Sequence, residues 1–159
     1  GDHRDLHSFP TRRSSDLAQE RDVLAQAQGK RTPMLVKIAP DVDDVQIDAV
    51  ARAALEHGVD GLIASNTTVT RPGLGQSPIA SETGGLSGAP LRVMSTAVLR
   101  KLRQHLDKKF VLIGVGGICS ADDAREKISA GADLVQVYSG FIYEGPGLIR
   151  SCAEALSSN

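Results

Sequence analysis

Polar and glycine-rich stretches recur in this sequence directly after short apolar runs, and their residue types suit binding chemistry. They are Ser65-Asn-Thr-Thr68, Gly114-Val-Gly-Gly117 and Tyr138-Ser-Gly140, and Lys37 lies within a further apolar run. Backbone amides of a glycine turn ahead of a helix can bind a phosphate. An amide side chain beside hydroxyls can hold a planar ligand that carries carbonyl and N–H groups. Together these patterns predict a ligand site where several strands end.

Lys37 is the charged residue that interrupts the apolar run 34–38. A desolvated ammonium needs an anion or a ring of hydrogen-bond acceptors. Lys37 can therefore face an anionic cofactor or substrate, but it can equally reach solvent from a strand end or pair with Asp41. The role of residues 65–68 is undecided for a similar reason: Asn, Ser and Thr can hold a ligand, but they also build ordinary turns. Spacing alone does not decide between these interpretations.

Two glycine stretches differ in how strongly their sequence surroundings indicate ligand binding. Gly84-Gly-Leu-Ser-Gly88 lies in a long loop-like region, 69–94, that also contains three prolines. Such a loop is either functional or disordered, and its glycines would let the backbone approach a ligand closely. Gly114-Val-Gly-Gly117 is more specific because it ends an apolar run and precedes a helix start. With Tyr138-Ser-Gly140 it predicts phosphate binding after two successive strands, an arrangement found in many (β/α)₈ barrels.

The elements that carry these stretches alternate between apolar strands and helices. The runs 34–38, 61–64, 110–114 and 134–138 are typical of buried parallel strands. We expect helices from Asp41 or Asp43 to about His57, from Ser120 to Gly131, and from Pro146 to about Ala155. Four strand–helix units predict an α/β domain. It is either a doubly wound open sheet or roughly the second half of a (β/α)₈ barrel, whose full length is about 250 residues.

Composition narrows the classes of function. The chain has 159 residues, with 18 basic and 19 acidic side chains and a net charge of −1. This balance excludes the broad cationic surface of a nucleic-acid-binding protein. No apolar run approaches the roughly 18 residues of a membrane-spanning helix. Cys119 and Cys152 form neither a metal-binding spacing nor a disulfide framework, so we expect no metal site and a structural role for Cys119.

Residues 1–17 differ in character from the rest, and we treat 18–159 as the domain. The segment shows neither helical nor strand periodicity. Its Arg and Ser content is compatible with a transit peptide, but its three aspartates argue against one. His7–Leu17, HSFPTRRSSDL, resembles the translation of a DNA-sequencing adaptor, and the alternative is a disordered natural tail. In the adaptor interpretation, the true upstream part of the protein is missing.

Four motifs, taken in order, resemble one enzyme family. They are LVKIAPD (35–41), GLIASNTTVTRP (61–72), SETGGLSGAPL (81–91) and IGVGGICSADDAREKISAGADLVQVYSGFIYEGPGLI (113–149). Their combination is similar to the C-terminal half of class 2 dihydroorotate dehydrogenase, the flavin-dependent, quinone-reducing enzyme of pyrimidine biosynthesis, over nearly all of residues 30–155. The resemblance favours the C-terminal half of a (β/α)₈ TIM barrel, with about four βα units. NTTVTRP and YSGFIYEGP favour class 2 over class 1, which uses a soluble acceptor.

The resemblance implies binding roles for eight residues, with FMN as cofactor and dihydroorotate or orotate as ligand. Cofactor contacts fall on Lys37, Ser65, Gly88, Gly117, Tyr138 and Ser139, and substrate contacts fall on Asn66 and Thr67. Lys37 would lie beside the pyrimidine edge of the flavin, where a cation favours the anionic reduced ring. Gly117, Tyr138 and Ser139 would bind the FMN phosphate, in agreement with the anion sites expected from the glycine stretches.

Several parts of the family's machinery have no match in this sequence, among them its first flavin-binding loops and its remaining orotate ligands. The proton-abstracting base of the family is a serine on an upstream loop, and N-terminal helices form its membrane-facing quinone tunnel. We therefore assign no catalytic residue. The parent enzyme is expected as a peripheral protein on the cytoplasmic side of the inner membrane, with quinone bound by the missing part and no nucleic-acid partner. As given, the chain is expected to be an inactive half-barrel that self-associates. A separate expectation is that this half-barrel retains some affinity for FMN.

Overall fold

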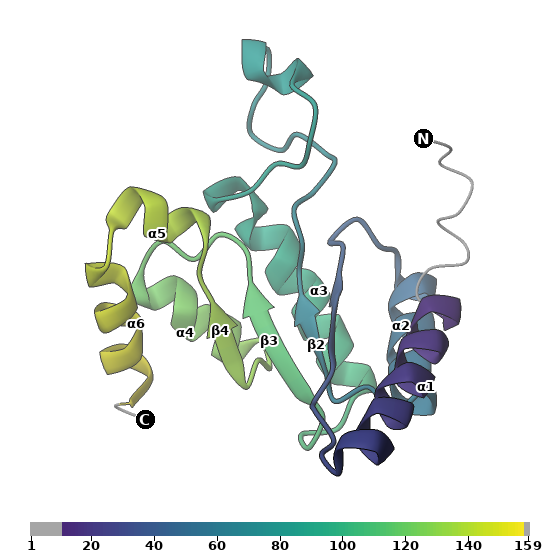
Figure 1. Cartoon of the computed structure of the whole chain (residues 1–159). Coiled ribbons are helices and arrows are strands. Elements are labelled where there is room, and N and C mark those ends of the chain that lie inside the picture. The colour runs from purple at the N-terminus through teal and green to yellow at the C-terminus, as the bar shows by residue number, and fades with distance from the viewer. Residues whose placement is uncertain (1–10, 158–159) are drawn as a thin grey trace.

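Four parallel strands form the centre of the molecule, and helices pack along them (Figure 1). The computed structural model describes residues 11–157. The strands are β1 (Leu35–Ile38), β2 (Gly61–Ala64), β3 (Val111–Val115) and β4 (Leu134–Gln136), paired in the order β1-β2-β3-β4. Parallel pairing in sequence order requires a crossover after each strand, so the α/β prediction is confirmed. Three strands differ slightly from expectation: β1 begins one residue later, β3 is shifted by one residue at both ends, and β4 ends before Tyr138.

Helices supply the crossovers, and several begin and end at residues that the sequence marks. They are α1 (Thr11–Gln28), α2 (Asp44–Glu56), α3 (Arg92–His105), α4 (Ala121–Ser129), α5 (Ser139–Glu144) and α6 (Gly147–Ser157), with 3₁₀ turns at Pro78–Ser81 and Ala89–Leu91. Asp43 caps α2 through a reciprocal capping box with Gln46, and Ser120 caps α4. Gly58 and Gly131 follow α2 and α4 with φ of 61° and 108°, a conformation that glycine adopts without a Cβ penalty.

The two faces of the sheet have different surroundings. On the helix side, Leu62 and Leu112 are almost fully buried and belong to the main core with residues of α2 and α3. On the opposite side, Leu35 and Leu134 are 37% and 57% exposed. The expectation of fully buried strands is therefore wrong for this second face. The physical reason is that the helices pack on one side of the sheet only, within the residues that the structure describes.

The sheet is curved toward its helix-free face. Three strand spacings of about 4.8 Å would place β1 and β4 roughly 14 Å apart in a flat sheet. Yet the ammonium of Lys37 on β1 donates to Oε1 of Gln136 on β4 across 3.4 Å. The two long side chains meet because the sheet bends and both extend over its concave face. Curvature of this kind favours a segment of a barrel over an open, doubly wound sheet.

Helix α1 crosses the boundary that the sequence suggested between Leu17 and Ala18. It begins at Thr11 and so includes residues 11–17, where the sequence shows no helical periodicity, while residues 1–10 lie outside the described residues. Residues 18–28 are rich in strong helix formers, and a helix once nucleated gains a hydrogen bond for each residue added. Arg21 ties α1 to the body by donating to the Gly58 carbonyl at 2.9 Å. The origin of residues 1–17 stays a prediction.

Candidate functional site

A cavity of about 220 Å³ at the carboxyl ends of the strands brings together the eight residues expected at the site. Its lining includes Lys37, Ser65, Asn66, Thr67, Gly88, Gly117, Tyr138 and Ser139. Residues distant in sequence meet here because the carboxyl ends of parallel strands lie at one end of the sheet. The volume is below the roughly 300–1,000 Å³ of pockets for drug-sized ligands, so these residues enclose only part of a larger ligand.

The wall of the cavity after β3 is a glycine loop, residues 116–119, packed directly on α3. A Cβ on Gly117 would lie 2.6 Å from Cα and 2.7 Å from N of Arg92, and the residue has a φ of +75°. A Cβ on Gly116, where φ is +103°, would lie 2.9 Å from Oγ of Ser95. Because both glycines also line the cavity, the loop backbone contacts α3 on one side and the cavity on the other. Bare backbone of this kind can bind an anion through its amides.

The start of α5 and the end of the long loop after β2 close another side of the cavity. The hydroxyl groups of Ser87 and Ser139 lie 2.9 Å apart, within hydrogen-bond distance. A Cβ on Gly88 would be in ordinary contact with Ser139 Cβ, at 3.7 Å. Tyr138 lines the cavity too, although its side chain is largely exposed. The predicted phosphate-side residues Gly117 and Ser139 are thus brought together, and Gly88 lies beside them.

Lys37 reaches the cavity from the concave face of the sheet, and it is exposed. Of the alternatives left open for Lys37, its exposure agrees with a side chain that reaches solvent, because none of the described elements covers that face. The alternative pairing with Asp41 is wrong. The Asp41 carboxylate accepts hydrogen bonds from the Thr68 hydroxyl and the Val69 N–H, whereas Lys37 donates to the Gln136 amide.

The backbone after β2 is bound to both neighbouring strands before the loop begins. The Ser65 N–H donates to the Val115 carbonyl at 3.2 Å, and the Asn66 N–H donates to the Ile38 carbonyl at 2.7 Å. Ser65 is buried and its hydroxyl donates to the Asn66 carbonyl. Asn66 and Thr67 are exposed, so a carboxamide and a hydroxyl lie at the cavity on a rigid backbone.

Sequence reasoning missed Arg71, which organises the loop 69–88. In Figure 1 this loop projects beyond the carboxyl ends of the strands. The guanidinium of Arg71 donates to the carbonyls of Ala80, Glu82 and Gly84 at 3.3, 2.8 and 2.7 Å. A planar group with five N–H donors suits several carbonyls at once, and an arginine at the head of a loop rich in Gly and Pro is the signal that could have revealed it. Thr68 and Leu86 also exchange backbone hydrogen bonds, at 3.1 and 2.8 Å.

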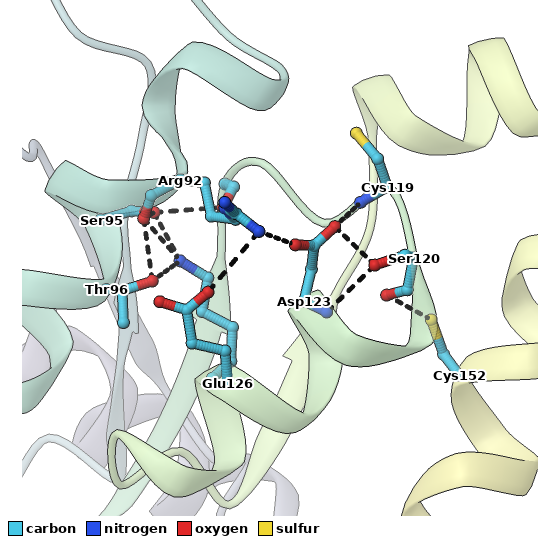
Figure 2. A network of polar contacts seen from close by, with 10 residues as sticks. Arg92, Ser95, Thr96, Cys119, Ser120, Asp123, Glu126 and Cys152 are labelled. Atoms are coloured by element: carbon cyan, nitrogen blue, oxygen red, sulfur yellow. Dashed lines mark hydrogen bonds and ion pairs between the residues drawn. The ribbon is translucent and has the colours of Figure 1, made fainter.

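A buried polar network beneath the glycine loop was missed as well. The Asp123 carboxylate pairs with Arg92 and accepts from the Cys119 N–H and the Ser120 hydroxyl at 3.0 and 2.9 Å (Figure 2). Burial by itself would raise the pKa of Asp123, but these hydrogen bonds outweigh it and hold the pKa below its ordinary value. Burial raises the pKa of the Cys119 thiol, and Asp123 and Glu144 raise it further. A thiol of this kind is protonated at neutral pH, which fits the structural role expected for Cys119.

The donor set of the cavity suits a planar ligand that carries a phosphate. A lysine ammonium, a carboxamide, several hydroxyls and the backbone of glycines packed on α3 surround it. Within residues 11–157, no group of three or more His, Cys, Asp and Glu side chains is placed to hold a metal ion. None of the helices described is long and apolar enough to cross a membrane.

Comparisons with known proteins point to one family. The family described as dihydroorotate dehydrogenase matches residues 11–159. Dihydroorotate dehydrogenase (quinone) from Flavobacterium lutescens is 55% identical over 142 residues, which are 89% of this chain and 41% of the relative. The protein of that name from Thiobacillus denitrificans is 56% identical over 143 residues, which are 90% of this chain and 42% of the relative. The chain thus spans about two fifths of the length of these curated relatives.

A solved structure agrees with the sequence matches. The structure of DHODH from Eimeria tenella in complex with ferulenol is similar with a TM-score of 0.74 at 43% identity, over 82% of this chain and 34% of that chain. With the parallel, curved sheet, this likeness confirms the expected segment of a TIM barrel. The family match, the identity of more than half of the aligned residues to quinone-type enzymes and the shared fold lead to one conclusion: this chain belongs to the dihydroorotate dehydrogenase family.

Proposed function

We propose that this chain provides flavin-binding and substrate-binding residues of a dihydroorotate dehydrogenase that oxidises dihydroorotate to orotate, in pyrimidine biosynthesis, and reduces a quinone. One observation carries the proposal: the eight residues chosen for FMN and orotate line a common cavity. The matched relatives named dihydroorotate dehydrogenase (quinone) support a quinone over the soluble acceptor of a class 1 enzyme.

Each residue has a role that follows from its chemistry and place. Gly117, Tyr138 and Ser139 would hold the phosphate of FMN, because bare backbone and a hydroxyl meet there. Lys37 would place a cation beside the pyrimidine edge of the flavin. FMN, when bound, supplies the hydride acceptor. Ser65 and Gly88 would contact the ring system from the strand end and from the loop.

Asn66 and Thr67 would bind and orient the substrate. Their carboxamide and hydroxyl provide both donors and acceptors, as the carbonyl and N–H groups of a pyrimidine ring require. Oxidation of dihydroorotate also removes a proton, which needs a general base within hydrogen-bond reach of the reacting carbon. We assign that base, the quinone site and the peripheral contact with the cytoplasmic side of the inner membrane to parts of the enzyme outside this chain.

Reconstitution from two polypeptides tests the proposal. The chain would be co-expressed with the part of the Xylella fastidiosa relative, 56% identical over 141 residues, that precedes the matched region. We expect quinone reduction that depends on dihydroorotate and that neither polypeptide shows alone. The same relative divided at the same point is the positive control. Activity from the divided relative without activity from this chain would contradict the proposal.

A matched pair of lysine variants sharpens this experiment. Lys37→Ala should slow flavin reduction about 100-fold, the order of loss seen when a charge-stabilising group is removed from an active site. Lys101→Ala is the control, because Lys101 is also exposed but pairs with Asp44 at the α2–α3 contact. Equal rates for the two variants would remove Lys37 from the reaction.

A second candidate concerns the 159 residues alone: a half-barrel that binds FMN without turnover. The observation that favours it is the pair of outer strands, β1 and β4, each hydrogen-bonded on one side only within the described sheet and carrying the exposed Leu35 and Leu134. Open, apolar strand edges promote self-association. We expect quenching of flavin fluorescence at high micromolar protein, association in sedimentation, and no oxidation of dihydroorotate. A monomer with measurable turnover would overturn this candidate.

A further inference from the structure

Lys127 is a fully buried lysine at the contact between α3 and α4, outside the cavity lining. Its ammonium donates to the Arg92 carbonyl at 3.2 Å, to Oγ of Ser95 at 2.6 Å and to Oγ1 of Thr96 at 2.7 Å. All three acceptors are uncharged oxygens on α3. A buried charge held only by neutral partners costs stability relative to an apolar side chain of the same size, so packing alone does not account for a lysine here.

The protons of this cluster can be assigned one by one. The Ser95 hydroxyl has a single proton, and its Oγ lies 3.0 Å from the Arg92 carbonyl and 3.1 Å from the Gly116 carbonyl. The Arg92 carbonyl already accepts from Lys127 and, at 2.8 Å, from the Thr96 hydroxyl. An ammonium that donates to Ser95 occupies a lone pair of its oxygen. The proton of Ser95 is therefore directed to the remaining acceptor, Gly116.

Gly116 belongs to the glycine loop 116–119, and the far end of that loop is held from the same helices. The Asp123 carboxylate on α4 accepts from the Cys119 N–H and pairs with Arg92 (Figure 2). The two supports share Arg92, whose carbonyl faces Lys127 and whose guanidinium faces Asp123. The loop is thus fixed at Gly116 by a hydroxyl and at Cys119 by a carboxylate.

We propose that Lys127 and Ser95 are positioning residues for the phosphate end of the cavity: the ammonium orients the Ser95 hydroxyl, which fixes the Gly116 carbonyl and keeps the loop amides in place for an anion. The inference rests on the proposed binding of FMN by Gly117. Neither residue touches the cavity, so the effect passes through the loop backbone.

The test uses the thiol of Cys119 as a probe of the loop and the buried thiol of Cys152 as a probe of global opening. Alkylation by iodoacetamide would be followed at each cysteine by mass spectrometry in the chain, in Ser95→Ala and in Lys127→Met. The control is Val98→Ala, which shortens a buried side chain on the core face of α3, the helix that carries Ser95. The measurement needs neither a bound flavin nor a monomer.

We expect Ser95→Ala and Lys127→Met to speed alkylation of Cys119 at least fivefold relative to Cys152, while Val98→Ala leaves this ratio within about twofold of the unsubstituted chain. An unchanged ratio in Ser95→Ala would overturn the inference. So would equal acceleration at both cysteines, because general destabilisation produces that pattern.

Titration with FMN separates this inference from the proposed function. The affinity for FMN is measured by the quenching of flavin fluorescence. Ser95→Ala should lower this affinity at least fivefold, and Val98→Ala should lower it less than twofold. If the unsubstituted chain does not bind FMN, the proposed function of this cavity fails, while the alkylation ratio still decides whether Lys127 and Ser95 hold the loop. If FMN binds and Ser95→Ala binds it equally well, the positioning role fails and the proposed function stands.

Discussion

Two loops that line the same cavity are held in contrasting ways. The glycine loop 116–119 lies on α3 and α4, and buried side chains hold it, among them Asp123 at Cys119 and Ser95 at Gly116. The loop 69–88 projects from the body, and most of its residues are exposed (Figure 1). Its main supports are the Arg71 guanidinium and the single bridge between Thr68 and Leu86.

The contrast indicates different stabilities for the two sides of the cavity. A segment with few buried apolar contacts opens at a lower free energy than one packed into the core. The side of the cavity where a phosphate is expected is formed by the glycine loop 116–119, which connects β3 to α4 within this chain. The loop that packs against the expected substrate residue Thr67, by contrast, depends on Arg71 and the Thr68–Leu86 bridge, and we expect it to open without unfolding the sheet. Three predictions test this difference between the two loops, in order of the expected change in the free energy of unfolding, from the largest to the smallest.

Gly117→Ala should produce the largest loss, about 4 kcal/mol in the free energy of unfolding. A left-handed backbone costs a residue with a Cβ about 1–2 kcal/mol, and overpacking adds about 1–3 kcal/mol. The overpacking arises because the new Cβ would lie 2.6 Å from Cα of Arg92, which is backbone and cannot turn aside. Unfolding in urea followed by circular dichroism measures the change.

Gly75→Ala is the matched control in the exposed loop. Gly75 also has a positive φ, +51°, but a Cβ there would meet nothing within 4 Å. Only the backbone cost remains, so we expect a loss of about 1 kcal/mol. Similar losses for the two variants would show that the glycine loop is not packed more tightly than the projecting one.

Much of the framework could be predicted because it depends on local chemistry. Asp43 and Ser120 cap helices through contacts three residues away, and Gly58 marks a helix end by a conformation that other residues avoid. Parallel strands bring their carboxyl ends together wherever they pair, so residues after each apolar run meet at the cavity. The limits of α1 were less predictable, because helix propagation carries it past a change in composition at Leu17.

The supports of the cavity could not be predicted because they join residues distant in sequence. Lys127 is separated from Ser95 by an entire βα unit, and their contact depends on the packing of α3 against α4. In sequence, Lys127 has the spacing of an ordinary surface lysine on a helix. The exposure of Lys37 was left open by the sequence for a related reason. An apolar run indicates a strand, but it does not report which face of the sheet the helices cover.

The free energy of unfolding should depend on pH through Lys127. Desolvation lowers the pKa of Lys127 from 10.5 to about 8, and Arg92 adds to the lowering, against the opposing effects of Glu126 and Asp123. Between these two pH values the unfolded chain keeps a proton that the folded chain has released, so the free energy of unfolding rises with pH. The full rise is about 3 kcal/mol, and below pH 8 both states are protonated and the penalty is complete.

Comparison with Lys127→Met isolates this effect from other groups that titrate in the same range. Urea unfolding at pH 7, 8, 9 and 10 would be measured for both proteins. The difference in free energy of unfolding, unsubstituted chain minus variant, should increase steadily above pH 8. A difference that is constant across the series would contradict a depressed pKa for Lys127.

Arg71→Lys should have the smallest effect on global stability, about 1 kcal/mol, and a large local one. A single ammonium cannot hold the carbonyls of Ala80, Glu82 and Gly84 in the planar arrangement that the guanidinium provides. The loop 69–88 should therefore open more often. Cleavage after Glu82 by a glutamate-specific protease should rise about fivefold, whereas Arg100→Lys, a change at an exposed position on α3, should leave it unaltered.

The sites of cleavage decide how independent the two loops are. Faster cleavage at Glu82 with no change at Glu126, which lies on α4 beneath the glycine loop, would show that the projecting loop opens by itself. Faster cleavage at both would mean that Arg71 supports the whole cavity. Unchanged cleavage at Glu82 would show that the bridge between Thr68 and Leu86 holds the loop without the arginine, and the contrast between the two sides would then rest on that bridge alone.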